Sequence, residues 1–123
     1  MRCQTFAAEA DDVRVARSLV ADALFLQGFP DESCLDAALL TSELVTNAVV
    51  HAGTVFEVAM TIDNGRVLVA VVDRSTRLPQ PTPVATDATT GRGLGLVDAI
   101  ASAWGAELTA DGKIVWFELA AAS

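Results

Sequence analysis

Apolar residues recur at helical spacing over the first half of the chain. Residues 9–27 carry one apolar stripe and residues 31–52 carry a second, and Gly28 and Gly53 follow them as helix-ending residues. The first stripe consists of Val13, Ala16, Val20, Ala23 and Leu24. The pattern therefore predicts two consecutive helices, joined by the short segment "GFPDES".

The spacing changes from helical to alternating after Gly53. In residues 55–62 every second side chain is apolar, and "DNG" is a typical hairpin turn before "VLVAVV", which is apolar on both faces as a central strand is. Further expected elements are a short edge strand at 2–6, a helix at 95–103, and a second hairpin with strands at 106–110 and 114–119. Together they predict a single domain, residues 1–123, of the α+β class. Its architecture would be a two-layer sandwich, a mostly antiparallel sheet with helices on one face.

Three polar residues interrupt the apolar second helix at four-residue intervals. Glu43, Asn47 and His51 lie within "ELVTNAVVHAG", and residues four apart share one face of a helix. Burying a carboxylate and an amide without partners costs on the order of a few kcal/mol each. Glu43 and Asn47 therefore need a partner, whereas His51 is explained by its place near a helix C-terminus, where a cation is favoured.

The segment "GRGLGL" at residues 91–96 is a glycine-rich turn that opens a helix. It is no dinucleotide-binding fingerprint, because that motif needs a strand immediately before the glycines. Backbone N–H groups at such a helix start suit an anion such as phosphate. A flexible helix entry without a ligand explains the same glycines, and both interpretations stay open.

Residues 74–92 fit neither period and contain three of the four prolines of the chain. A loop of this length in a small domain is usually functional or disordered, and its place before the glycine-rich helix favours a function. Asp73, just before it, can accept a hydrogen bond from a ligand or can be a solvated strand end. Arg74, Arg77 and Arg92 form a basic rim on or beside the loop, although loop solubility explains each one singly.

Acidic residues outnumber basic ones, 16 against 8, and the formal net charge is −8. This balance argues against direct nucleic-acid binding and against anionic membrane surfaces, which need clustered Lys and Arg. Asp22 and Gln27 interrupt the most apolar segment, so no membrane span is expected. The two cysteines, Cys3 and Cys34, form no metal-binding pattern, and the N-terminus turns acidic without a signal peptide. A cytoplasmic protein with free thiols is expected.

The order of these features resembles the GHKL ATP-binding fold (the Bergerat fold) of gyrase B, histidine kinases, mismatch-repair ATPases and heat-shock chaperones. Within that superfamily the chain is most similar to single-domain anti-sigma factors, the serine-protein kinases of partner-switching systems. The resemblance spans about residues 4–119. Its most specific parts are "SELVTNAVVHAG", "GRGLGLVDAIASAWGAEL" and "GKIVWFEL".

The resemblance implies a role for each candidate residue. Asn47 would hold a Mg²⁺ that bridges the phosphates of ATP, and Glu43 would be the general base toward the attacking hydroxyl. Asp73 would accept a hydrogen bond from the adenine amine, and residues 74–90 would form a lid over the nucleotide. The other residues implied in nucleotide binding are Arg77, Gly91, Arg92, Gly93, Leu94 and Gly95.

Two features depart from the family's pattern. The strand-end box of the family reads Asp-x-Gly-x-Gly, and here Ser75 and Arg77 stand in place of the glycines, where side chains narrow the approach to adenine. Ile114 stands where many relatives have a Thr near the adenine. Weak or purely regulatory nucleotide binding is therefore one expectation, although Glu43 and Asn47 are both present.

Three functions are compatible with the resemblance. The first is an ATP-binding anti-sigma regulatory factor that phosphorylates serine in an anti-sigma-factor antagonist and also binds a sigma factor. The second is a non-catalytic module that sequesters one of these partners, with weak or vestigial nucleotide binding. The third is a detached histidine kinase catalytic domain, which is least favoured because no helical segment carries a phosphoacceptor His. The resemblance also implies a homodimer.

Overall fold

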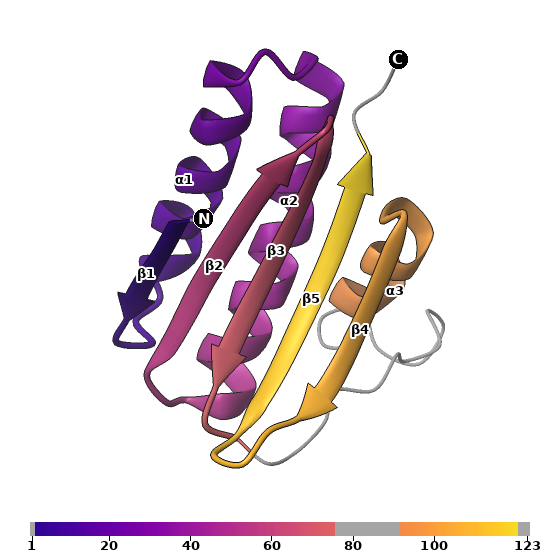
Figure 1. Cartoon of the computed structure of the whole chain (residues 1–123). Coiled ribbons are helices and arrows are strands. Elements are labelled where there is room, and N and C mark those ends of the chain that lie inside the picture. Colours follow the sequence, from indigo (N-terminus) through magenta and orange to yellow (C-terminus); the bar gives the residue numbers. More distant parts are fainter. Residues whose placement is uncertain (1, 76–91, 121–123) are drawn as a thin grey trace.

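Helices and strands follow one another in the predicted order within residues 2–75 and 92–120, which the computed structural model describes (Figure 1). The strands are β1 (Arg2–Phe6), β2 (Phe56–Asp63), β3 (Arg66–Asp73), β4 (Ala103–Leu108) and β5 (Lys113–Ala120). The helices are α1 (Asp12–Leu26), α2 (Asp31–Asn47) and α3 (Arg92–Ile100), and the π-helical turn η1 (Ala48–Ala52) extends α2.

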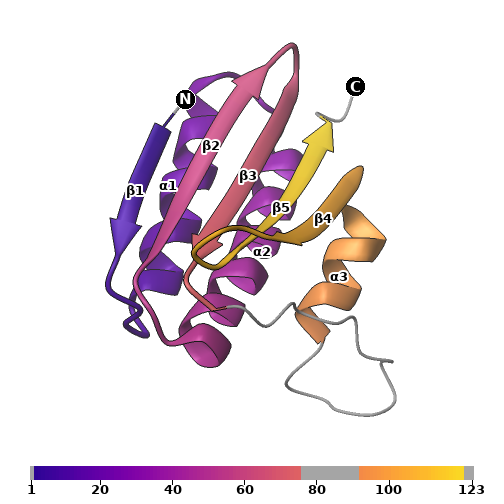
Figure 2. The same cartoon turned by 60° about the horizontal axis from the view of Figure 1, so that its bottom comes forward.

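The five strands form one sheet in the order β1-β2-β3-β5-β4, and every pairing is antiparallel. β3 lies at its centre, as its apolar residues on both faces predicted. The helices all lie on the same face of the sheet (Figures 1 and 2). The predicted two-layer α+β sandwich is confirmed.

The core lies between the helices and that face of the sheet. Alternate residues of the two central strands point into it because side chains of a strand alternate between its faces. These are Val67, Val69 and Val71 of β3, and Val115, Phe117 and Leu119 of β5. At one edge, the stacked rings of Phe6 and Phe56, with centroids 5.2 Å apart, join β1 to β2. The alternation that predicted the strands thus also fixes which face the helices cover.

The second helix reaches Ala52 as predicted, but its last turn is π-helical and not α-helical. The Gly53 N–H donates to the Ala48 carbonyl oxygen, five residues earlier, at 2.9 Å. Gly53 has a φ of 63°, a left-handed conformation that glycine adopts without steric cost. The widened turn therefore lies directly after Asn47, and π-helical turns inside helices are frequent at functional sites.

The third helix and the fourth strand begin earlier than predicted. The sequence placed them at 95–103 and 106–110, whereas α3 is Arg92–Ile100 and β4 is Ala103–Leu108. The Ser102 N–H donates to the Glu118 carbonyl oxygen at 2.9 Å, so the chain joins β5 as soon as α3 ends. Gly105 is taken up in the strand, where a Cβ would lie 2.9 Å from the Trp116 ring of β5. Pairing with β5 therefore starts β4 earlier than the sequence pattern predicted.

One helical segment of the described chain, Asp31–Val50, is long and apolar enough to cross a membrane, which the sequence pattern did not lead us to expect. Half of it is buried inside the domain, where α2 packs against α1, α3 and β5. The core helix of a soluble protein has the same length and composition, so the segment is weak evidence for a membrane span.

Candidate functional site

Four elements meet at one end of the sheet (Figure 2). β3 ends there, β5 and α3 begin there, and α2 passes into η1, which contacts β3. The topology therefore brings the C-terminal half of α2, the carboxylate after the central strand, and the start of the glycine-rich helix to the same region. Sequence reasoning expected these features to form one site.

Glu43 lies on α2 beside the fully buried Leu44 and is itself half-buried. Burial raises the pKa of the Glu43 carboxyl, because desolvation disfavours its charged form. Within the described part of the chain its carboxylate has no hydrogen bond or ion pair with another side chain. A carboxylate with a raised pKa and unused acceptors is suited to take up a proton.

Asn47 is the last residue of α2, one turn beyond Glu43, and it is also half-buried. Its amide has no hydrogen-bond partner among residues 2–75 and 92–120. The amide oxygen is the neutral, hard ligand type that Mg²⁺ accepts in proteins. His51, the third residue of the four-residue series, lies in η1, but its side chain is outside the described part of the structure.

Asp73 makes contacts that its expected role does not include. It is buried at the end of β3, and its Oδ2 lies 2.9 Å from Nζ of Lys113, the first residue of β5. The side chains are only 2% and 3% exposed, respectively. The two residues are direct partners in the β3–β5 register, so the antiparallel pairing itself places the cation on the carboxylate.

Backbone groups surround the same carboxylate. The Ser75 N–H donates to Asp73 Oδ1 at 2.8 Å, and Lys113 Nζ lies 3.2 Å from that oxygen. Gly112 packs on the Asp73 peptide, since a Cβ there would lie 1.9 Å from the Asp73 carbonyl oxygen. Arg74 donates its N–H to Thr54 Oγ1 at 3.2 Å, which ties the strand end to the segment after η1. Asp73 is therefore a structural ion-pair partner in this chain.

Ile114, expected where many relatives have a Thr near the adenine, is not on the face of β5 that carries Lys113. Alternate residues of β5 face the helices, beginning with Lys113, and Ile114 points to the other face of the sheet, between Val72 and Glu107. Lys113 thus occupies the position near Asp73, and sequence reasoning missed it. The signal was present: Lys113 continues the buried alternation of "KIVWFEL", which places a lysine on a buried face where only an acidic partner makes it tolerable.

The glycine-rich segment is described in part. Gly91 and Arg77 lie outside the described residues, and the side chains of Arg92 and Leu94 are not described. The structure describes a helix from Arg92 onward, and the space around Gly95 is open, with no atom within 4 Å of an added Cβ. The segment does open a helix, as predicted, but the helix starts at Arg92, so Gly93 and Gly95 lie within it and not before it. The lid of residues 74–90 falls almost wholly outside the described residues, so it stays a prediction.

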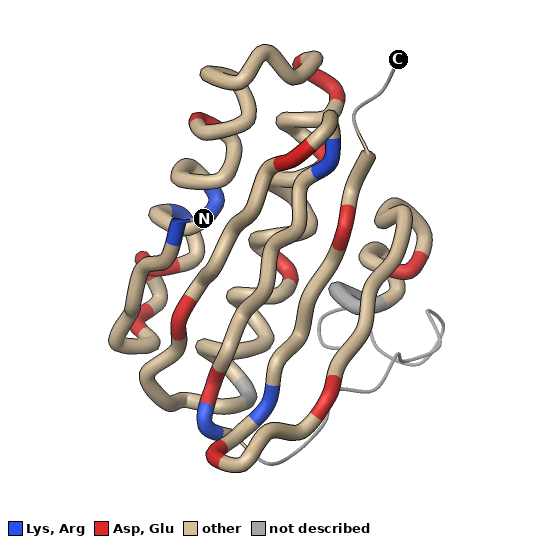
Figure 3. Tube along the Cα trace, in the orientation of Figure 1, with Lys and Arg blue, Asp and Glu red and all other residues tan. Residues whose placement is uncertain are grey.

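The expected basic rim is also only partly described. Arg74 is exposed at the end of β3, whereas Arg77 and the side chain of Arg92 are not described. Along the described trace, basic positions are scattered among acidic and uncharged ones (Figure 3). The rim stays a prediction.

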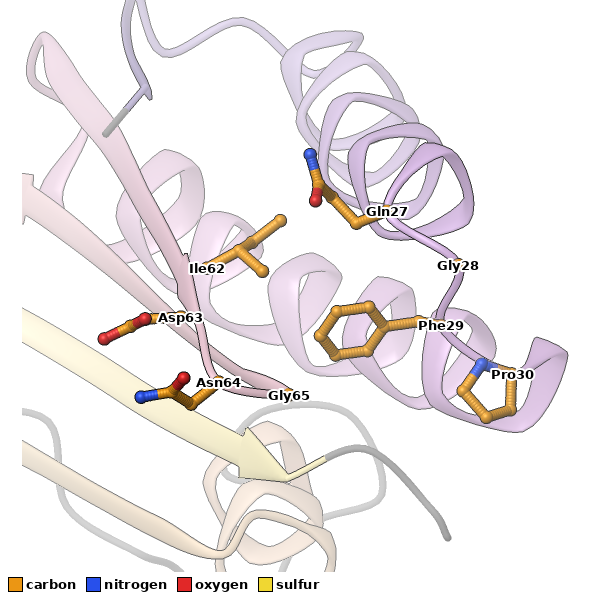
Figure 4. A pocket seen from close by; sticks show the side chains of 8 residues that line it. All are labelled: Gln27, Gly28, Phe29, Pro30, Ile62, Asp63, Asn64 and Gly65. Atoms are coloured by element: carbon orange, nitrogen blue, oxygen red, sulfur yellow. The ribbon is translucent and has the colours of Figure 1, made fainter.

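A pocket lies at the opposite end of the sheet, between the α1–α2 connection and the β2–β3 turn (Figure 4). Figure 4 shows its lining residues: Gln27, Gly28, Phe29, Pro30, Ile62, Asp63, Asn64 and Gly65. None of the predicted site residues contributes to it. It is therefore separate from the candidate site.

Comparisons with known proteins agree with this fold. A two-layer domain with helices on one face of the sheet belongs to the broad α+β class, and here polar side chains lie at one end of that sheet. The family model of the histidine kinase-like ATPase domain matches residues 6–119. The chain belongs to that family, which is one of nucleotide-binding domains. A search among curated proteins gave no match.

Among solved structures, the chain is similar to the crystal structure of the RsbU and RsbW domains of Rv1364c from Mycobacterium tuberculosis. The TM-score is 0.70 at 21% sequence identity, and the match covers 98% of this chain and 33% of that one. At this identity the similarity shows the fold. The chain corresponds to about one third of that longer chain.

Proposed function

We propose that the chain binds a nucleoside triphosphate with Mg²⁺ at the end of the sheet, with Asn47 as the metal ligand from the protein. The observation that supports this most directly is the pair of polar side chains Glu43 and Asn47, which have no partner among the described residues, on a core helix of a histidine kinase-like ATPase domain. Their acceptors need a partner, and a metal–phosphate group supplies one.

The residues fit one end of such a ligand better than the other. Among the described residues nothing occupies the side-chain oxygens of Asn47 and Glu43, which suit a cation and a reacting hydroxyl. The first turn of α3, from Arg92 to Gly95, has backbone N–H groups of the kind that suit phosphate. When bound, Mg²⁺ would neutralise phosphate charge. Asp73, in contrast, has its carboxylate occupied by Lys113, so it does not fit the role of accepting from adenine.

Glu43 is proposed as the general base. Its raised pKa and lack of a partner among the described residues suit a group that takes the proton of an attacking serine hydroxyl. On this basis the chain is an anti-sigma regulatory factor of the cytoplasm with serine-protein kinase activity toward an anti-sigma-factor antagonist. The family and the similarity to a structure that contains an RsbW domain support this assignment, and the acidic composition is consistent with a protein partner and not with nucleic acid.

A second candidate is a module that sequesters a sigma factor or an antagonist, as a homodimer or a monomer, without catalysis. The Asp73–Lys113 ion pair favours it, because the pair occupies the carboxylate that would otherwise recognise the base. Weak nucleotide binding and loss of phosphotransfer would follow.

The first test is calorimetric titration of the full chain with ATP in the presence and absence of Mg²⁺. Asn47→Ala is expected to remove most of the Mg²⁺ dependence, since the neutral oxygen ligand is lost. Glu43→Ala is expected to retain binding and to abolish phosphotransfer to an antagonist protein, because a general base acts only in the chemical step.

Each outcome separates the candidates. If Asn47→Ala binds ATP with the same Mg²⁺ dependence as the wild type, the metal assignment is wrong. If the Glu43→Ala variant keeps full kinase activity, Glu43 is not the base. Binding without phosphotransfer in the wild type, across several antagonists, would favour the sequestering module.

A further inference from the structure

The Asp73–Lys113 ion pair leaves almost none of the Asp73 carboxylate available to a ligand. Oδ2 is 2.9 Å from Lys113 Nζ, and Oδ1 accepts from both that nitrogen, at 3.2 Å, and the Ser75 N–H, at 2.8 Å. With both side chains at most 3% exposed, the pair is sealed from solvent. An amine donor therefore reaches the carboxylate only after Lys113 has moved away.

The fold opposes that movement. Lys113 is in register with Asp73, and Gly112 packs so closely on the Asp73 carbonyl oxygen that a Cβ would overlap it. The Thr109 N–H donates to the Gly112 carbonyl oxygen at 2.9 Å and closes the β4–β5 turn. Displacing Lys113 would leave a buried carboxylate without its cation, which is strongly unfavourable. A ligand amine, which is neutral, compensates for only part of that loss.

We propose that Lys113 takes the place on Asp73 that the amino group of a base would take, so that the site does not select adenine. This inference rests on the proposed function, because it concerns a nucleotide held at its phosphate end near Asn47. The ligand class is then nucleoside triphosphates in general, and Lys113 is the residue that sets this breadth. For this site to select a base, the Asp73–Lys113 ion pair would have to be broken.

The test compares three ligands on the full wild-type chain with Mg²⁺: ATP, GTP, and purine riboside triphosphate, which has no exocyclic amine. The Kd values measured by calorimetry are expected to agree within about threefold. A hydrogen bond from the amine to a charged acceptor would instead favour ATP over purine riboside triphosphate by about tenfold or more. A preference of that size in the wild type overturns the inference.

Lys113→Thr is the complementary variant, because it removes the cation and leaves the Asp73 carboxylate free to accept. Its preference for ATP over purine riboside triphosphate is expected to rise to about tenfold. Arg66→Ala, which removes an exposed ion pair between the same two strands, is the control and should leave the ratio unchanged. If Lys113→Thr is folded and binds the three ligands alike, Lys113 does not suppress base selection and the inference is wrong.

These outcomes are distinct from failure of the proposed function. If no nucleotide binds to either protein, the proposed nucleotide binding is wrong and the inference is wrong with it. If ATP binds selectively to the wild type, nucleotide binding stands and only the inference is lost. If the threonine variant does not fold, the wild-type series decides alone, since it needs no variant.

Discussion

At the scale of single residues, the burial of Glu43 lowers stability and at the same time suits the residue to a function. It is half-buried on a core helix, and no side chain in the described part of the structure compensates its charge. Such a group weakens the fold when it is ionised, and a functional site is where this cost is expected to persist. The uncompensated burial of this carboxylate predicts a specific dependence of stability on pH.

Burial raises the pKa of Glu43, so the folded state holds this proton more tightly than the unfolded chain does. Its contribution to the free energy of unfolding is therefore largest below the ordinary glutamate pKa, about 4.3, and is lost as pH rises through the raised value. Glu43→Gln, which is neutral at every pH, should be more stable than wild type near neutral pH and should approach wild type at about pH 4.

Urea denaturation at several pH values between those limits measures this difference. Glu107→Gln, a substitution of an exposed glutamate on β4, controls for the chemical change itself. A Glu43→Gln variant that is less stable than wild type at neutral pH would mean that a partner stabilises the Glu43 charge.

At the scale of elements, two ion pairs join β3 to β5, one at each end of the strands, and they differ in burial. Asp73–Lys113 is almost fully buried, whereas in Arg66–Glu118, at 2.7 Å, the side chains are 58% and 35% exposed. Removing one partner of a buried pair leaves an uncompensated charge in the core, which costs about 3–5 kcal/mol. An exposed pair contributes only about 0–1 kcal/mol.

Asp73→Ala or Lys113→Met alone should therefore lower the free energy of unfolding by about 3–5 kcal/mol. The double variant should lower it by much less, because no unpaired charge is left in the core when both residues are replaced. Arg66→Ala and Glu118→Ala should each cost about 1 kcal/mol or less. Urea denaturation of the set measures both cycles. Equal losses for the two pairs would show that solvent reaches Asp73 and Lys113.

The elements themselves were predictable where their period was long and regular. Alternation from Phe56 onward and the turn "DNG" predicted β2 and β3, and the two apolar stripes predicted α1 and α2. The start of β4 was missed: the sequence pattern placed the strand at 106–110, whereas it begins at Ala103 and includes Gly105, which makes room for Trp116. Local signals show which period a segment has, but tertiary contacts decide where it stops.

Part of the candidate site was also predictable from the sequence. Glu43 and Asn47 stood out because polar residues at four-residue spacing are costly in an apolar helix, and that cost is visible in the sequence. The partner of Asp73 was not, because it depends on the register of two strands 40 residues apart. A single residue of slip would have placed Ile114 on the buried face in place of Lys113.

At the scale of the whole molecule, the net charge limits which classes of partner the domain can bind. Acidic residues exceed basic ones by 16 to 8, and several of the basic residues are engaged within the fold. Lys113 is buried on Asp73, Arg66 is paired with Glu118, and Arg14 is paired with Asp11 at 3.0 Å. The described trace has no stripe of free Lys and Arg along one element or face (Figure 3).

The domain should therefore not bind nucleic acid directly, and any effect on transcription should pass through a protein. Non-specific DNA binding has a Kd of about 10⁻⁴–10⁻⁶ M at physiological salt and tightens steeply as salt falls, because phosphate contacts release counterions. Fluorescence anisotropy of a labelled duplex should accordingly stay flat up to about 100 μM protein even at about 50 mM salt. A basic DNA-binding protein, measured alongside, shows that the assay responds. Salt-sensitive binding in this titration would contradict the charge argument.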